Sequence, residues 1–318
     1  MSAILAVTVP FFALVLCGYL AAQRGLLPEA AIPGLNAFVL YFALPCLLFR
    51  FGIATPVLQL LNPVVLGAWI GASLLVVLLT LGLTLSERLP LNDAAFGALV
   101  AAFPNTGFMG VPLLAALLGP AAAGPVICTI LADLFVTSSL CIGLAQLHET
   151  RGGSAWTGVW RALRGASSNP LPWSIVAGAA CGLAGVRLYA PLDAVVKMLA
   201  DASTPVALFA IGSVLWRARR HAATRTPLAR YLPVVLIKLV VHPALVFALG
   251  ALALKHGAPI SKFQLGAVTL AAALPSASNV SLLAERYGAD NGFVARVILG
   301  STALAFVTFS ALAWLIAG

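Results

Sequence analysis

The stretch Ala101–Leu114, which reads A-A-F-P-N-T-G-F-M-G-V-P-L-L, places polar and helix-breaking residues inside an apolar run long enough to cross a bilayer. Its two prolines and two glycines disfavour a continuous helix, because proline lacks a backbone N–H and clashes with the carbonyl four residues earlier. Irregular backbone at membrane depth is tolerated only where it is buried in protein or lines a wet cavity. We therefore predict a broken membrane helix that forms a binding site.

The chemistry predicted at this break is recognition of a small anion such as a carboxylate. A half-helix that restarts after Pro104 presents free amides and the positive end of its dipole, and both favour an anion. Asn105 and Thr106 add side chains that can bond a carboxylate or cap the half-helix. Gly107 and Gly110 allow a ligand or a crossing helix to approach the backbone closely. The alternative is a kinked structural helix whose glycines serve helix packing.

A second stretch with the same features occurs late in the chain. Ala272–Asn279 reads A-A-L-P-S-A-S-N, so that Pro275 is followed by small polar residues as Pro104 is. Substrate contacts are expected from Pro275, Ser276, Ser278 and Asn279. The alternative is that these side chains form hydrogen bonds between helices.

Four ionisable residues fall within apolar runs, where such residues usually have a function. Burial disfavours the charged form of Asp133, which leaves a proton-coupling role and a structural ion pair as alternatives. Lys238 and His242 are four residues apart and share a helix face. Lys238 could provide a countercharge for a substrate carboxylate or pair with Asp133, whereas His242 could couple protons or only pack. Arg296 could face an anion or extend to the cytoplasmic surface.

The composition identifies the class of protein. Of 318 residues, 62% are hydrophobic and only 8% are charged, whereas a soluble domain carries roughly 25% charged residues. Apolar runs of about 20 residues indicate membrane helices rather than a barrel. The net charge of +9 fits arginines in cytoplasmic loops better than nucleic-acid binding. Scattered histidines, unpaired cysteines and the lack of HExxH or GxSxG motifs predict no enzyme, no metal and no cofactor.

We predict an all-α integral membrane fold with ten transmembrane helices. The predicted spans run about 2–22, 32–52, 63–85, 93–118, 121–147, 170–187, 191–216, 231–254, 261–285 and 292–316. Lysine and arginine are concentrated on one side of this topology, which places both termini outside. The expected cytoplasmic connections hold Arg24, Arg88, Arg151, Arg161, Arg164, Arg217, Arg219, Arg220, Arg225, Arg230 and Arg286. The opposite side holds Arg50, Arg187, Lys197, Lys255 and Lys262.

Prolines at matching positions indicate an internal repeat. Pro45 in the second span corresponds to Pro205 in the seventh, and Pro104 in the fourth corresponds to Pro275 in the ninth. Because five is odd, two halves of five spans have opposite orientations. We predict one membrane domain, with repeat one over about 1–147, a cytoplasmic linker over about 148–169 and repeat two over about 170–318. Interrupted spans in corresponding positions of inverted halves indicate the binding site of a transporter.

Three further polar features receive structural interpretations. The Arg217–Arg230 cluster is interpreted as a topology determinant that also attracts anionic lipid. Glu285 is interpreted as part of a solvated loop after the ninth span. Asn36 is interpreted as a residue that seals a helix interface.

Several segments together resemble the auxin efflux carrier family of secondary transporters, which includes bacterial permeases and the plant PIN proteins. The most specific is F-P-N-T-G-F-M-G-V-P, at Phe103–Pro112. The others are Leu35–Pro45, Asn169–Gly178, Pro205–Leu215 and Leu274–Asp290. These pieces cover almost the whole chain.

The resemblance implies that broken helices 4 and 9 cross near the bilayer centre. It also implies a scaffold of helices 1, 2, 6 and 7, which mediates dimers in the plant members, and a transport unit of helices 3–5 and 8–10. The family moves organic anions, including auxin and small carboxylates such as malonate. Sodium-coupled bile-acid transporters look like distant relatives, but their carboxylate- and glutamine-rich sodium site has no clear counterpart here.

These observations predict a secondary transporter that moves a small organic anion across the inner membrane by elevator-type alternating access. Proton coupling and uncoupled movement are both compatible with the sequence. The expected partners are the substrate, the lipid bilayer and a second copy of the chain at the scaffold helices. The alternatives are a membrane-embedded ligand sensor on the same fold and an ion channel.

Overall fold

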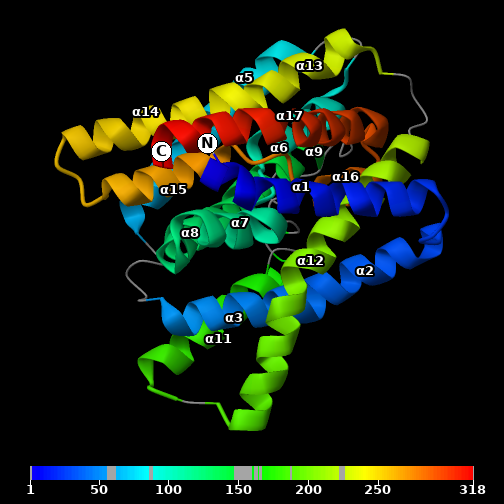
Figure 1. The fold of residues 1–318 in the computed structure, drawn as a ribbon. Helices are drawn as coiled ribbons and strands as arrows, with labels where there is room; N and C mark the ends of the chain where they lie inside the picture. The colour runs from blue at the N-terminus through cyan, green and yellow to red at the C-terminus, as the bar shows by residue number, and fades with distance from the viewer. Residues whose placement is uncertain are drawn as a thin grey trace.

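The computed structural model describes residues 2–55, 62–85, 89–146, 160, 164, 167–186, 188–221 and 226–317. Within these residues the chain forms helices and no β-strand, as Figure 1 shows. This confirms the predicted all-α membrane class. Most of the predicted linker 148–169 lies outside the described residues, as do Arg88, Arg151, Arg161, Arg187 and Arg225.

Seven helical runs in the described part of the chain are long and apolar enough to cross a membrane. They are α1 (Ser2–Gln23), the run Glu29–Ala54, α5 (Pro63–Thr84), the run Pro120–Gln146, α12 (Ala190–His221), the run Leu228–Lys255 and α17 (Asn291–Ala317). The three composite runs contain α2 (Ile32–Phe38) and α3 (Leu44–Ala54), α8 (Ala123–Ala132) and α9 (Ser138–Gln146), and α13 (Leu228–Leu236) and α14 (His242–Lys255).

The remaining helices are shorter. They are α6 (Leu91–Ala102), α7 (Val111–Leu118), α11 (Pro170–Leu183), α15 (Lys262–Ala272) and α16 (Asn279–Arg286). Helix α6 ends before Pro104 and helical structure resumes at Thr106, while α15 ends before Pro275 and α16 begins at Asn279. The irregular backbone therefore lies at the two proline-containing stretches that the sequence singles out.

Widened π-helical turns interrupt four of the helical runs. Three of them, Val39–Ala43, Thr106–Gly110 and Ile237–Val241, end two residues before a proline. The carbonyl four residues before each proline, with which its ring would clash, lies inside the π turn. The widened turn thus accommodates the proline. The fourth π turn, Asp133–Thr137, has no proline after it, and such turns are frequent at functional sites.

The helices pack in two groups. In Figure 1, α3 and α11 lie at the bottom, α5, α13 and α14 lie at the top, and α1 runs between them beside α17. In the first group α1 packs against α12, and α3 packs against α11 and α12. In the second group α5 packs against α6 and α14, α14 against α15, and α13 against α17. The groups meet where α1 contacts α17 and α7, and where α12 contacts α17 and the π turn Thr106–Gly110.

Glycines allow two very close helix crossings in the first group. A Cβ at Gly212 of α12 would overlap the backbone of Val15 in α1, and a Cβ at Gly18 would overlap the carbonyl oxygen of Phe209. The α3–α11 crossing is built in the same way, because a Cβ at Gly178 would overlap the carbonyl oxygen of Phe49. Backbone approach of this kind is typical of membrane helix interfaces.

The first part of α1 lies beside the last part of α17. The Ser310 hydroxyl near the end of α17 donates to the Thr8 hydroxyl near the start of α1, at 3.4 Å. Both side chains are buried, and Figure 1 shows the N- and C-termini near one another.

Candidate anion site at the crossing of two interrupted helices

The two irregular stretches cross and pair through their backbones. The Asn105 amide donates to the Pro275 carbonyl at 2.8 Å, and the Ala277 amide donates to the Phe103 carbonyl at 2.9 Å. Pro104 and Ser276 form the centre of this antiparallel bridge. Because the two stretches run in opposite directions, the helices that start after the bridge leave the crossing in opposite directions.

A side chain replaces the hydrogen bond that Pro104 removes. Val100 is four residues before Pro104, which has no N–H to donate to the Val100 carbonyl. The Ser276 hydroxyl donates to that carbonyl at 2.7 Å instead, and the Ser276 amide donates to the Ser301 hydroxyl at 3.1 Å. Ser276, predicted as a substrate contact, therefore has a structural role in holding the crossing together.

Several amide donors at the crossing have no partner. Among the described residues, the amides of Gly107 and Phe108 donate no hydrogen bond, and neither do those of Ser278 and Asn279. The first pair opens the helical run Thr106–Leu118, and the second pair opens α16. Two positive helix ends thus meet at one crossing, which is an arrangement suited to an anion.

Polar side chains accompany these amides. The Asn105 side chain is 3% exposed, yet it has no hydrogen-bond partner in the described part of the chain and does not cap the helix. Thr106 is 2% exposed, Ser278 is buried and Asn279 is half-buried. Neither the oxygen nor the nitrogen of the Asn105 side chain is among the fully enclosed polar atoms that lack a partner in the described residues, so this side-chain amide keeps some accessible surface at which a ligand or water can form hydrogen bonds.

The two glycines at the break have different surroundings. A Cβ at Gly107 would meet no atom within 4 Å, so there is open space beside the free amide of this residue. A Cβ at Gly110 would lie 2.7 Å from the Leu274 side chain. Gly110 therefore serves the packing of the two irregular stretches, whereas Gly107 lies beside space that a ligand could fill.

Lys238 contacts the end of α15, the helix that leads into the second irregular stretch. Its side chain is fully buried, and its ammonium donates to the Ala272 carbonyl at 2.7 Å. The ammonium also contacts Nδ1 of His242 at 3.1 Å, as their spacing on one helix face predicts. Since Ala272 is the last residue of α15, the ammonium lies at the negative end of that helix. Direct contact of Lys238 with substrate stays a prediction.

Asp133 belongs to the same buried network. Its Oδ1 accepts hydrogen bonds from the Trp69 indole at 2.8 Å and from the Thr137 hydroxyl at 3.2 Å. Asp133 also interacts electrostatically with Lys238. Oδ2 of Asp133 and Nε2 of His242 are buried and have no hydrogen-bond partner among the described residues.

Arg296 is half-buried in α17, and its Nε is buried without a hydrogen-bond partner among the described residues. No contact of Arg296 with the crossing distinguishes between the two roles predicted for it. Within the residues that the structure describes, no group of three or more His, Cys, Asp or Glu side chains could hold a metal.

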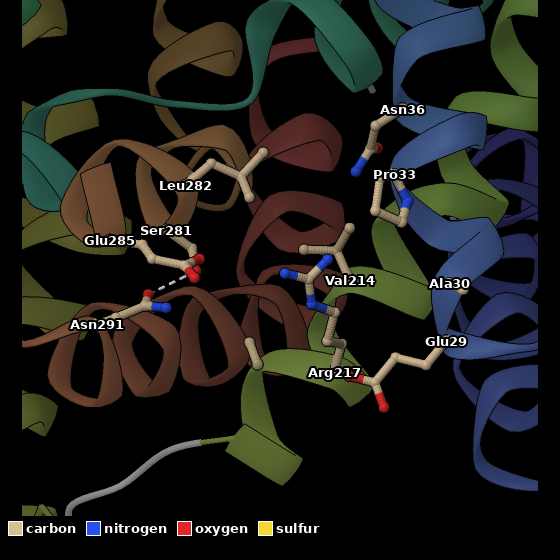
Figure 2. A pocket seen from close by; sticks show the side chains of 11 residues that line it. Glu29, Ala30, Pro33, Asn36, Val214, Arg217, Ser281, Leu282, Glu285 and Asn291 are labelled. Carbon is tan, nitrogen blue, oxygen red and sulfur yellow. Dashed lines mark hydrogen bonds between the residues drawn. The ribbon is translucent and has the colours of Figure 1, made fainter.

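A cavity of about 430 Å³ lies between the two helix groups (Figure 2). Glu29, Asn36 and Arg217 line it from the first group, while Ser281, Glu285 and Asn291 line it from the second. Figure 2 shows the Arg217 side chain reaching into this space, opposite α16. In the described part of the chain Arg217 and Glu285 form no ion pair, whereas Glu29 lies 3.8 Å from Arg220.

Sequence reasoning missed two partners of Asp133 and the cavity. Thr137 follows Asp133 by four residues, a spacing that could have indicated a shared helix face. Trp69 is distant in sequence, and no local pattern marks its indole as a donor. Glu285, Arg217 and Asn36 were interpreted separately, and only the fold brings them to one cavity.

The sequence profile of one family, described as membrane transport protein, matches residues 3–158 and 158–313. A protein named "Putative malonate transporter" from Rhizobium meliloti (strain 1021) is 30% identical over 321 residues, which cover 99% of this chain and 97% of that protein. A protein named "Uncharacterized transporter YfdV" from Escherichia coli (strain K12) is 25% identical over 292 residues, which cover 87% of this chain and 86% of that protein.

Proposed function

Because the chain belongs to the membrane transport protein family, that of the auxin efflux carriers, we propose that it is a secondary transporter for a small organic anion. The observation that carries this proposal is the meeting of two helix starts beside the buried Asn105 side chain. Four amides at these starts, and the Asn105 side chain, have no hydrogen-bond partner among the described residues. The relative named a malonate transporter supports a carboxylate as substrate. The mechanism is alternating access of the elevator type.

A dicarboxylate such as malonate suits the two-sided form of the site. One carboxylate would accept hydrogen bonds from the Asn105 side chain and the amides of Gly107 and Phe108. The other would meet the amides of Ser278 and Asn279 at the start of α16. Hydrogen bonds to a charged group contribute about 1.5–3 kcal/mol each, net of the contacts with water that they replace, so several of them together would favour binding of the anion.

The architecture we propose has ten crossings. The contact between Thr8 and Ser310 supports termini on one side of the membrane and hence an even number of crossings. Seven long runs alone would be odd. We add the interrupted helix α6–α7, the helix α11 and the interrupted helix α15–α16. Helices 4 and 9 of this series are the broken pair.

The packing supports two inverted five-helix repeats, over about 1–147 and 170–318 with the linker 148–169 between them. If each helix of one half is replaced by its counterpart in the other half, the α1–α12 pair becomes the α11–α3 pair. Both pairs pack closely through a glycine at the contact. The same exchange turns the α5–α6 pair into the α14–α15 pair, and both pack together. Related pairs of this kind are expected from an inverted repeat.

The two helix groups correspond to a scaffold of helices 1, 2, 6 and 7 and a transport unit of helices 3–5 and 8–10. We propose that the transport unit, which carries the crossing, moves against the scaffold during each cycle. The cavity between the groups would then be the route to the site from one side. A homodimer through the scaffold helices is part of this proposal.

We further propose that both termini face the outside of the plasma membrane. The cavity lined by Arg217 then opens toward the cytoplasm, because Arg217 and the other arginines near the end of α12 belong to a predicted cytoplasmic connection. This orientation allows the anion to enter or leave through a cavity that contains Arg217, a cation that forms no ion pair within the described part of the chain.

Replacing Arg217 by glutamate should raise the KM for a carboxylate on the cytoplasmic side about threefold to tenfold, with a smaller effect on the maximal rate. The cavity would then hold three acidic side chains and lose the cation that attracts an anion. The measurement is initial uptake into vesicles of known orientation. Arg24→Glu makes the same charge change on the predicted cytoplasmic side outside the cavity and should leave KM unchanged. Equal effects of the two substitutions would contradict the proposed route.

The function itself is tested by counterflow in proteoliposomes. Vesicles loaded with malonate, or with other mono- and dicarboxylates, should accumulate labelled malonate, with and without a pH gradient. An inward or outward proton gradient that changes the rate would indicate proton coupling, and an unchanged rate would indicate uncoupled movement. Binding of a carboxylate without any movement across the membrane would instead favour a ligand sensor.

A further inference from the structure

We propose that the ammonium of Lys238 takes the position that a sodium ion would otherwise occupy at the end of α15. Because the protein supplies this positive charge itself, carboxylate exchange is independent of sodium. This inference rests on the proposed transport function and adds to it the source of the positive charge near the anion site. It starts from the contacts of a single fully buried side chain.

The end of α15 is a natural place for a cation. The last four carbonyls of a helix lack intrahelical partners and form the negative end of its dipole. In transporters with interrupted membrane helices, such half-helix ends and the unwound carbonyls next to them coordinate the coupling cation. Here the Ala272 carbonyl, at the last residue of α15, accepts a 2.7 Å hydrogen bond from the ammonium of Lys238.

Two neighbouring groups offset part of the cost of burying the Lys238 ammonium. Burying an ammonium is costly unless it is paired and hydrogen-bonded. Its Nζ has a second partner in Nδ1 of His242 at 3.1 Å, and Asp133 interacts with it electrostatically. Because Nδ1 accepts this hydrogen bond, the proton of a neutral His242 lies on Nε2. The carboxylate of Asp133 is held in turn by the Trp69 indole and the Thr137 hydroxyl.

The position of the charge suits an anion at the crossing. The Ala272 carbonyl that holds the ammonium lies at the end of α15, four residues before the pairing residue Ser276, and the free amides of Ser278 and Asn279 follow directly after the pairing. Lys238 comes from the run Leu228–Lys255, which belongs to the proposed transport unit. Its charge would therefore travel with the anion and lower the cost of carrying it through the bilayer, with no inorganic ion added.

The test compares cations in proteoliposomes and in purified protein. Wild-type exchange of labelled malonate should be equal, within about twofold, in sodium, potassium and choline. Lys238→Ala should lose at least tenfold in choline and recover several-fold in sodium or methylammonium, because the substitution leaves space for a small cation beside the Ala272 carbonyl. Methylammonium or sodium should also raise the melting temperature of purified Lys238→Ala, and neither should change that of the wild type.

Two control variants accompany Lys238→Ala. Lys238→Met fills the same space without a charge and should be inactive in every cation, with no change in melting temperature on adding one. Lys255→Ala removes an exposed lysine at the end of α14 and should behave as the wild type.

Three results would overturn the inference: sodium-dependent exchange by the wild type, full exchange by Lys238→Met, or a folded Lys238→Ala that no cation activates or stabilises. Where the alanine variant does not fold, the wild-type comparison and Lys238→Met can each still overturn the inference. Failure of the proposed function looks different, because the wild type would then exchange no carboxylate in any cation while the melting temperatures of the variants still report on the cation position.

Discussion

Replacing Asn105 by alanine is expected to lower carboxylate exchange at least tenfold while the protein still folds. The Asn105 side chain is almost completely buried at the crossing and has no partner in the described part of the chain, so its removal costs the fold no hydrogen bond. With a carboxylate bound, the same change removes a hydrogen bond to a charged group, for which about 1.5–3 kcal/mol is typical. A loss of that size corresponds to roughly a 10- to 100-fold weaker interaction.

The measurement is initial malonate exchange per folded transporter, together with the melting temperature. The matched control is Asn62→Ala, which removes an asparagine that caps α5 by accepting hydrogen bonds from the amides of Val64 and Val65. Loss of such a cap costs about 1 kcal/mol of stability and should leave exchange unchanged. If Asn105→Ala lowered the melting temperature and left exchange per folded molecule intact, Asn105 would be a structural residue and the assignment of the anion site would be wrong.

The irregular backbone could be located from the sequence because its causes are local. Pro104 and Pro275 each stop a helix by their own geometry, and the small polar residues after them indicate where a helix can restart. The partners of the backbone carbonyls that the prolines leave without a hydrogen bond could not be identified in the same way. The partner that Val100 needs is Ser276, which is 176 residues away, and a sequence pattern contains no information on which hydroxyl reaches it.

The charged residues show the same limit. The spacing of Lys238 and His242 predicts that they share a face, and the contact at 3.1 Å agrees with it. The partner at the Ala272 carbonyl depends on how two helices pack, and it is the observation from which we propose that Lys238 is a cation held at a helix end. A pairing of Lys238 with Asp133 was one of the open alternatives, and their electrostatic interaction supports it.

The helix crossings of the first group lead to the second large effect. Gly18→Ala and Gly178→Ala should each lower the melting temperature by about 5 °C or more, because each new Cβ would overlap a backbone carbonyl of the facing helix. Backbone cannot move aside as a flexible side chain can, so the helices must separate and lose packing over their whole contact. Overpacking of this kind costs about 1–3 kcal/mol in well-packed interiors, and the loss should lie at the upper end here.

Gly67→Ala is the control, since a Cβ at Gly67 would meet no atom within 4 Å and alanine is the better helix former. Its melting temperature should equal or exceed that of the wild type. The comparison of Gly18 with Gly178 also tests the inverted repeat, which makes the α1–α12 and α11–α3 crossings equivalent and places these two glycines at corresponding positions. Similar losses at both positions are expected from that symmetry. A loss at Gly18 with none at Gly178 would mean that the two crossings contribute differently to stability, and that the resemblance of their glycine contacts does not reflect a repeat.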